Sequence, residues 1–349
     1  MTVAAPAAPS PPVAANPGSS SSLQRQPFLD GWRGLAILLV LDAHFTRIGP
    51  LHLGLSQAGR LGVDVFFCLS GLLMSRLLFE KRMPLGLFYK RRFSRVYPAF
   101  FVYVMGCVLI ALATHITPRW DEVLSSLAFM RTYYPLEPWI WKSQLFVDHF
   151  WSLNVEEHSY VLLGLVALLG LWRRLEALVI LGLAGATFVL FVLFTKRPEL
   201  MPAWGMLGTE IVASHLLLSA GYRRISPRVE RWVQPWMPLL AIIVSLLCYS
   251  SIATWWAPSL ISPLTLAFAV NHLHQSPAWL LKLLATRPLV WLGTYSFSIY
   301  LWQQPFFHAV REGSFDYPGV ALAAAMLAGW LSFKLIEAPA RNYLNRRWA

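Results

Sequence analysis

The stretch "LDGWRGLAILLVLDAHFTRIG" (residues 29–49) has the apolar character of a membrane-spanning helix, but it carries Arg33 and His44. A helix needs about 20 mostly apolar residues to cross the bilayer core. Eleven residues, at about 100° each, return a helix to within about 20° of its starting face. We therefore expect Arg33 and His44 to share one face, about 16 Å apart. Asp42 lies about 200° from His44 and is expected to point elsewhere.

Ionisable side chains inside a span are costly, and they usually face the bundle interior or a watery cavity. This cost favours a functional role for the pair Arg33 and His44. The simpler alternative is that Arg33 extends to the inner interface and that packing alone accommodates His44.

The whole chain has the composition of a membrane protein. Of its 349 residues, 56% are hydrophobic and 13% are charged, whereas about 25% are charged in a typical soluble protein. Apolar segments of about spanning length occur at residues 31–48, 61–79, 96–114, 150–172, 175–195, 203–220, 236–253, 257–273, 288–310 and 318–337. The sequence therefore predicts an all-α, polytopic membrane helical bundle of about ten transmembrane helices.

The distribution of Lys and Arg predicts that both termini are cytoplasmic. If the N-terminus is inside, inner segments hold 20 of the 29 basic residues and outer segments hold 8, with Arg33 in the first span. Basic residues concentrate in cytoplasmic loops of membrane proteins. The same distribution explains the net charge of +12 without a nucleic-acid partner.

The domain organisation is expected to be simple. Residues 1–24 are rich in Pro, Ala and Ser and carry no charged side chain, a composition typical of a disordered tail. Residues 25–345 form the predicted membrane domain. Because the sequence ends at Ala349, we expect no appended soluble domain.

The segment "GRLGVDVFFCLSGLLMS" (residues 59–75) opens an apolar run with Asp64 and interrupts it with Ser70 and Gly71. A carboxylate in the first turn of a helix is favourable with the helix dipole, and small residues allow close helix packing. Asp64 is therefore either a structural residue or a polar site residue.

The segment "FYKRRFSRVYPAF" (residues 88–100) contains Arg91, Arg92 and Arg95 at the expected cytoplasmic mouth of a span. Residues spaced by three are neighbours on a helix, although Pro98 is expected to limit how far the helix extends from upstream. Such a cluster either anchors the chain on anionic lipid or binds the phosphates of a cytosolic ligand.

The segment "HFWSLNVEEHSYVLLG" (residues 149–164) brings Glu156 and Glu157 into an apolar run. Adjacent carboxylates at membrane depth favour function. Either one of them pairs with a His or Arg elsewhere in the bundle, or the span starts later and both lie at the outer interface. Glu337 lies at the inner end of the last segment, on the expected level of Arg33. It either pairs with Arg33 or is an interfacial carboxylate without a partner. The nine His residues are scattered, so no metal site is expected.

In order along the chain, these blocks resemble acyltransferase family 3, the bacterial membrane O-acyltransferases that use acyl-CoA. The resemblance covers residues 26 to about 345. It rests on "FLDGWRGLAILLVLDAHF", "GVDVFFCLSGLLMS", "RRFSRVYP", "WSLNVEEHSY", "GTYSFSIYLWQQP" and "IEAPAR".

The resemblance implies roles for several residues. The family's essential base corresponds to His44, and the arginine of the same motif corresponds to Arg33. The Arg-x-x-Arg pair of the family, associated with acyl-CoA binding, corresponds to Arg92 and Arg95. Glu156, Glu157 and Glu337 correspond to recurrent acidic positions of the family.

Two motifs depart from the family pattern. The family often has Leu-Trp-His-x-Pro where this chain has "LWQQP" (residues 301–305), so the role of that His is absent or replaced here. "WSLNVEEH" (residues 151–158) carries Asn154 and His158 where Ser and Gln are commoner.

These implications combine into one expected mechanism, with acetyl-CoA as the expected donor. The phosphates of the acyl-CoA dock on Arg91, Arg92 and Arg95. His44, oriented by a carboxylate such as Glu156, deprotonates an acceptor hydroxyl, which attacks the thioester. A covalent relay through the enzyme is the alternative to direct transfer.

The expected acceptor is a cell-surface or exported glycan, free or lipid-linked, of the O-antigen or exopolysaccharide type. The alternatives are a small glycan or a secondary metabolite. The resemblance implies a multi-pass protein of the bacterial inner membrane, in contact with membrane lipids. A homo-oligomer is an open alternative to a monomer. From other classes, a proton-coupled transporter and a lipid-anchoring scaffold stay as alternatives.

Overall fold

The computed structural model describes residues 26–45 and 57–348, and these residues fold into helices joined by short connections. The predicted N-terminal tail lies outside the described residues. The α-helices are α1 (Pro27–Phe45), α2 (Ala58–Ser75), α3 (Leu85–Ala113), α4 (Trp120–Leu127), α5 (Phe150–Leu168), α6 (Arg173–Lys196), α7 (Thr209–Val212), α8 (Ser214–Val229), α9 (Trp236–Cys248), α10 (Ala257–Leu260), α11 (Ser262–Asn271), α12 (Ala278–Leu284), α13 (Arg287–Arg311), α14 (Pro318–Ser332) and α15 (Ala338–Arg347). The described part of the chain contains no β-strand, so the all-α prediction is confirmed.

Two π-helical turns extend longer helices. Arg76–Glu80 continues α2, and Phe333–Glu337 joins α14 to α15. As a result, Ala58–Glu80 and Pro318–Arg347 each run as one continuous helix.

Four of the described helices are long and apolar enough to cross a membrane: Ala58–Glu80, Leu85–Ala113, Arg173–Lys196 and Pro318–Arg347. The last two bury little of their apolar surface within the protein, and large side chains such as Leu178 and Val189 are exposed on α6. Exposed apolar surface of this extent fits contact with lipid rather than with water. The protein is therefore a membrane protein, whereas the ten crossings and the cytoplasmic termini stay predictions.

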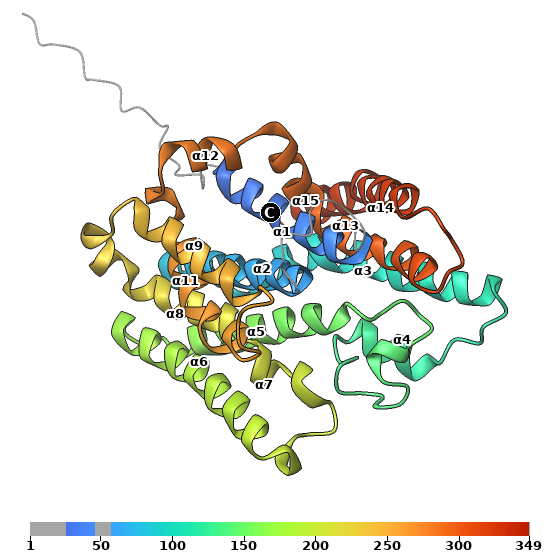
Figure 1. Cartoon of the computed structure of the whole chain (residues 1–349), viewed down its shortest axis with the longest axis horizontal. Helices are drawn as coiled ribbons and strands as arrows, with labels where there is room; N and C mark the ends of the chain where they lie inside the picture. Colours follow the sequence, from blue (N-terminus) through green and yellow to red (C-terminus); the bar gives the residue numbers. More distant parts are fainter. Residues whose placement is uncertain (1–25, 46–56, 349) are drawn as a thin grey trace, which may run out of the picture.

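The packing of the bundle places the polar helices inside. Figure 1 shows α6 and α14 at opposite edges of the molecule, with α1, α2, α5 and α13 between them. Helix α1 packs on both α13 and α2, and α2 packs on α8. The inner helices α2, α5 and α13 carry buried polar side chains, among them Asp64, Asn154 and Gln303.

Two glycines set the close crossing of α1 and α13. A Cβ atom at Gly34 would lie 2.0 Å from the carbonyl oxygen of Leu289, and one at Gly293 would lie 1.7 Å from that of Asp30. Only glycine allows two backbones to approach this closely. The crossing fixes the register between α1 and α13, on which the candidate site depends.

Three predicted segments differ from the observed helices. Pro98 lies inside α3, so it does not limit the helix from upstream, because a proline removes one backbone hydrogen bond and leaves the others in place. Segment 203–220 is interrupted at Ala213 between α7 and α8. Segment 257–273 is divided at Ile261 between α10 and α11.

Candidate active site

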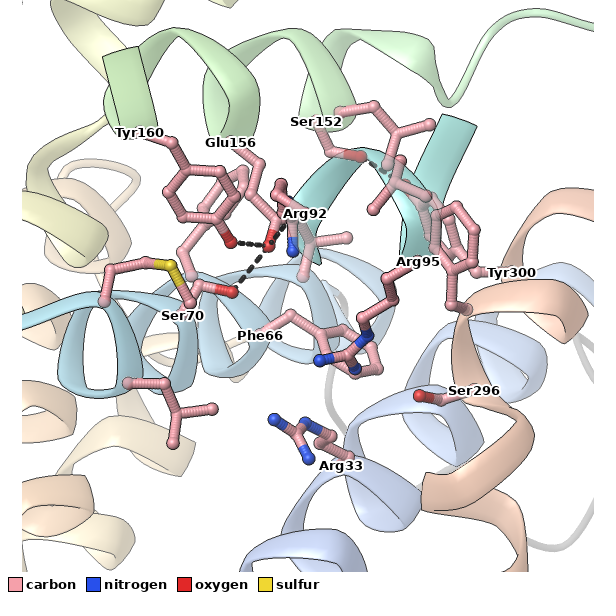
Figure 2. Close-up of a pocket in the computed structure, with 17 residues that line it drawn as sticks. Arg33, Phe66, Ser70, Arg92, Arg95, Ser152, Glu156, Tyr160, Ser296 and Tyr300 are labelled. Carbon is pink, nitrogen blue, oxygen red and sulfur yellow. Dashed lines mark hydrogen bonds and ion pairs between the residues drawn. The ribbon is translucent and has the colours of Figure 1, made fainter. Parts of the chain in front are cut away.

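A cavity opens among α1, α2, α3, α5 and α13, and its polar lining is rich in arginine. It contains about 750 Å³ of space free of protein atoms, part of it open to solvent. Arg33, Arg92 and Arg95 contribute to its wall. We call this space the arginine cavity (Figure 2).

The three arginines are not equivalent. Arg92 binds the carboxylates of Glu156 and Glu157, with N–O distances of 3.2 and 2.9 Å, and its guanidinium stacks 4.1 Å from the ring centre of Tyr160. Arg95 has no hydrogen-bond or ion-pair partner in the described part of the chain. Figure 2 shows Arg33 and Arg95 directed into the same space. Arg95 is therefore the arginine best placed to bind an anionic ligand.

Arg33 pairs with Asp30 at 3.0 Å, one turn earlier on α1. The ion pair considered between Arg33 and Glu337 is wrong. Glu337 accepts a hydrogen bond of 2.8 Å from Ser298 and lies 3.6 Å from Arg341. The reason is local: Arg341 is one turn beyond Glu337, so the two side chains share a face.

Arg91 does not join the arginine cavity. Its side chain is exposed on α3, whereas Arg92 and Arg95, three residues apart, both line the cavity. Adjacent residues of a helix point about 100° apart, which separates Arg91 from the other two.

The carboxylate of Glu156 is held within the arginine cavity. It accepts hydrogen bonds from Ser70 Oγ at 2.6 Å and from the Tyr160 hydroxyl, in addition to its pair with Arg92 (Figure 2). The expectation that Glu156 orients His44 is wrong, because these three partners hold Glu156 elsewhere.

A second cavity lies beyond the first, and we call it the histidine cavity because His44, His149 and His215 line it. It contains about 1450 Å³ of space free of protein atoms, part of it open to solvent. His44 Nδ1 lies 2.6 Å from Oε1 of Gln303, and its ring stacks on Phe307 with 4.2 Å between ring centres. An amide oxygen can accept a hydrogen bond but cannot donate one, so Nδ1 must carry the proton in this contact. Nε2 is then unprotonated and can act as a base.

The two cavities meet at Val63 and Tyr300, which line both of them. Beside them, Phe67 of the arginine cavity packs edge-on against Trp151 of the histidine cavity, with 6.2 Å between ring centres. The Tyr300 hydroxyl forms a 2.6 Å hydrogen bond with Ser152. Arg33 lines the first cavity and His44 the second, so α1 runs along both.

Asp64 belongs to a buried polar network on the wall of the histidine cavity. Its carboxylate accepts a 2.6 Å hydrogen bond from Tyr249 and lies 3.4 Å from His215 and 3.6 Å from Arg60. Because α2 begins at Ala58, Asp64 is one turn too late to cap the helix. The first-turn interpretation of Asp64 is therefore wrong.

Sequence reasoning did not single out Tyr300, His149 or His215. Each lies in or beside an apolar run, where a lone aromatic or histidine carries little pattern. Gln303 had a signal, because it stands in the family's His position of the "LWQQP" block. Within residues 26–45 and 57–348, no three His, Cys, Asp or Glu side chains gather as they would around a metal ion.

The sequence is similar to several known proteins. The chain is 28% identical over 360 residues to the peptidoglycan O-acetyltransferase OatA of Listeria monocytogenes, covering 90% of this chain and 56% of that protein. It is 26% identical to the putative peptidoglycan O-acetyltransferase YrhL of Bacillus subtilis, with 90% and 55% covered. A putative O-acetyltransferase of Staphylococcus aureus is 24% identical, with 92% and 58% covered. The chain thus spans a little over half the length of these relatives.

No solved structure matches the chain at a significant level. A family model described as an acyltransferase domain matches residues 26–335, which is most of the chain. The resemblance inferred from the six sequence blocks is therefore confirmed, and the chain belongs to this family of acyltransferase domains, the acyltransferase 3 family.

Proposed function

We propose that the protein is a membrane O-acyltransferase that moves an acetyl group from cytosolic acetyl-CoA to a hydroxyl of a cell-surface or exported glycan. One observation supports this most: the cavity lined by Arg95, which has no partner among the described residues, shares Val63 and Tyr300 with the cavity lined by His44, whose Nδ1 lies 2.6 Å from Gln303 Oε1. The donor phosphates and the reacting hydroxyl thus have separate places along the same helices.

In this proposal the donor enters the arginine cavity. The phosphates of acetyl-CoA bind Arg95 and Arg33, since guanidinium groups form strong charge-assisted bonds with phosphate oxygens. The pantetheine arm extends past Val63 and Tyr300 and brings the thioester into the histidine cavity. Because Arg92 already binds Glu156 and Glu157, it mainly holds the wall that positions Arg95.

The chemical step takes place at His44. Gln303 Oε1 accepts a hydrogen bond from Nδ1–H of His44, so the unprotonated Nε2 removes the proton of the acceptor hydroxyl as its oxygen attacks the thioester carbon. The C–O bond forms, the C–S bond breaks, and the protonated His44 returns its proton to the CoA thiolate. Base assistance of this kind contributes about 10²- to 10⁴-fold in rate.

The lining of the histidine cavity suits a sugar. Trp141, Trp151 and Trp255 contribute aromatic surface, and Arg60 and Asp64 contribute polar atoms at its wall. Aromatic rings with a polar surround can bind both the apolar face and the hydroxyls of a pyranose. The acceptors to test are O-antigen, exopolysaccharide and peptidoglycan, the last of which is named for two relatives. The proposal also places the protein in the inner membrane as a multi-pass protein.

The test is acetyl transfer by the purified protein in lipid nanodiscs, measured as release of free CoA with glycan present. His44→Ala should reduce the rate by about 10²- to 10⁴-fold. His272→Gln is a control, because His272 is a buried histidine that lies outside both cavities. Unchanged turnover by folded His44→Ala would contradict the proposed role, and no CoA release by the unaltered protein with any of these glycans would contradict the function.

A further inference from the structure

His149 is a buried histidine that the proposed mechanism leaves unused. Its side chain is 2% exposed and lines the histidine cavity. Neither ring nitrogen has a hydrogen-bond partner among residues 26–45 and 57–348. A buried polar group without a partner costs about 1–3 kcal/mol, so a bound molecule is the natural partner for this ring.

His149 lies next to Tyr300, the residue at which the two cavities meet. Its ring packs edge-on against Tyr300, with 5.2 Å between ring centres, and its carbonyl oxygen accepts a 3.3 Å hydrogen bond from the Tyr300 hydroxyl. Ser152 and Glu156 follow three and seven residues later, on the same face of α5, and both line the arginine cavity. A thioester that passes Tyr300 therefore reaches His149 as it enters the histidine cavity.

The N-terminal end of α5 contributes a field that favours negative charge at this point and acts against the buried carboxylate of Asp148, one residue before His149. His149 immediately precedes α5, a helix of 19 residues, so the positive end of the helix dipole lies beside the ring. Negative charge develops during acyl transfer on the carbonyl oxygen of the thioester. Fixed donors and dipoles aimed at such an oxygen commonly make a large contribution to the rate.

We propose that His149 and the N-terminal end of α5 form an oxyanion-binding site for the carbonyl oxygen of the acyl donor. This inference rests on the proposed function. As the acceptor oxygen bonds to the carbonyl carbon, the N–H of neutral His149 donates to the carbonyl oxygen and keeps its proton throughout. When the C–S bond breaks, the carbonyl reforms and His44 returns its proton to the thiolate.

The alternative role for His149 is to bind the acceptor hydroxyl. The groups best suited to the rest of a sugar, Arg60 and Trp255, line the histidine cavity but not the arginine cavity. His149, by contrast, is tied to Tyr300, the residue shared with the arginine cavity. This placement favours contact with the donor carbonyl over contact with the acceptor.

The experiment compares His149→Phe, which keeps a flat ring without a donor, with His149→Gln, which keeps an N–H donor. Steady-state acetyl transfer in nanodiscs should give a kcat about 10²- to 10³-fold lower for His149→Phe, with KM for acetyl-CoA and for the acceptor nearly unchanged. His149→Gln should recover a clear part of the lost kcat. The melting temperature should be equal to or above that of the unaltered protein for His149→Phe, which removes an unpartnered polar group, and close to it for His149→Gln, and CoA binding should match in both variants.

Three outcomes would overturn the site. The first is a kcat for His149→Phe equal to that of the unaltered protein. The second is an effect confined to KM for the acceptor, and the third is a fall in melting temperature that His149→Gln shares. If the unaltered protein and His272→Gln both fail to release CoA, the proposed function fails. If the unaltered protein and His272→Gln turn over normally and His149→Phe is equally active, the oxyanion site is contradicted but the proposed function is not.

Discussion

At the scale of single residues, Gln303 defines the chemistry of His44. The two residues are 259 positions apart in the sequence. Gln303 occupies the position where the resemblance leads one to expect a histidine. An amide oxygen accepts a hydrogen bond as the unprotonated nitrogen of a neutral histidine does, so the replacement can still orient His44. In the proposed mechanism, this contact lets a chain that departs from the "LWHxP" pattern use His44 as its base.

Gln303→Leu tests this role. Leucine fills similar space but cannot accept a hydrogen bond from Nδ1–H, so His44 loses its fixed tautomer and orientation. A neutral hydrogen bond contributes about 0.5–1.5 kcal/mol, so we expect kcat to fall by at least about 2- to 13-fold. Gln303→His should retain most of the activity. Equal turnover by Gln303→Leu and the unaltered protein would contradict the assignment.

The arginines allow a second prediction, because Arg92 and Arg95 lie one turn apart but have different partners. Arg95→Ala should raise KM for acetyl-CoA by about 10- to 100-fold, since a hydrogen bond to a charged group contributes about 1.5–3 kcal/mol. Its melting temperature should stay unchanged, because Arg95 has no ion-pair partner in the described residues. Both quantities can be measured on nanodisc-embedded protein.

Arg92→Ala should act mainly on stability. It leaves Glu156 and Glu157, each about one-fifth exposed, without their shared cation, and breaking such a pair costs about 3–5 kcal/mol. A large fall in melting temperature is therefore expected. Arg91→Ala, on the exposed face of α3, serves as the control and should alter neither quantity. An Arg92→Ala variant as stable as Arg91→Ala would contradict this distinction.

Predictions that depended on one helix alone had mixed outcomes, because the first-turn interpretation of Asp64 and the expected limit at Pro98 were wrong. The spacing of Arg33 and His44 placed both on one side of α1, and the structure finds both lining cavities. The partners of His44 and Glu156 could not be predicted, because helical periodicity gives the face of a residue and not the helix that packs there. Gln303 and Ser70 come from distant helices.

At the scale of elements, the crossing of α1 and α13 carries the site. Gly34 and Gly293 let the two backbones touch, and the same contact sets His44 opposite Gln303. Gly293→Ala should therefore reduce both melting temperature and acetyl transfer, because overpacking a close contact costs about 1–3 kcal/mol or more. Shifting α13 also separates Gln303 from His44.

A matched control for this prediction lies on α6. A Cβ atom at Gly185 would meet no atom of the described residues outside its own helix backbone within 4 Å, and alanine in a helix interior is favoured over glycine by about 0.5–1 kcal/mol. Gly185→Ala should leave activity intact and keep or raise the melting temperature. Should Gly293→Ala behave as Gly185→Ala does, the crossing does not set the site.

At the scale of the whole molecule, hydropathy identified the lipid-facing helices and the buried helix Ala58–Glu80, but not the helices richest in cavity-lining polar residues. Segments such as 175–195 and 318–337 coincide with helices that meet the length and composition of a span. Helices α5 and α13 do not, because they carry the polar side chains that line the cavities. These polar residues lower the hydropathy of the helices that carry them, although the helices are buried in the bundle. The number of crossings therefore cannot be derived from composition alone.

The two cavities share Val63 and Tyr300, and this arrangement predicts that the enzyme takes its acyl donor from one side of the membrane. If the basic ends of the helices face the cytoplasm, acetyl-CoA reaches the arginine cavity from that side only. Acetyl-CoA is charged and does not cross lipid, so inverted membrane vesicles should release CoA while right-side-out vesicles should not. Mild detergent should make the two preparations equal, which controls for the amount of enzyme. Equal release by both sealed preparations would mean that the donor has a path from either side, and the arginine cavity would then not be its entrance.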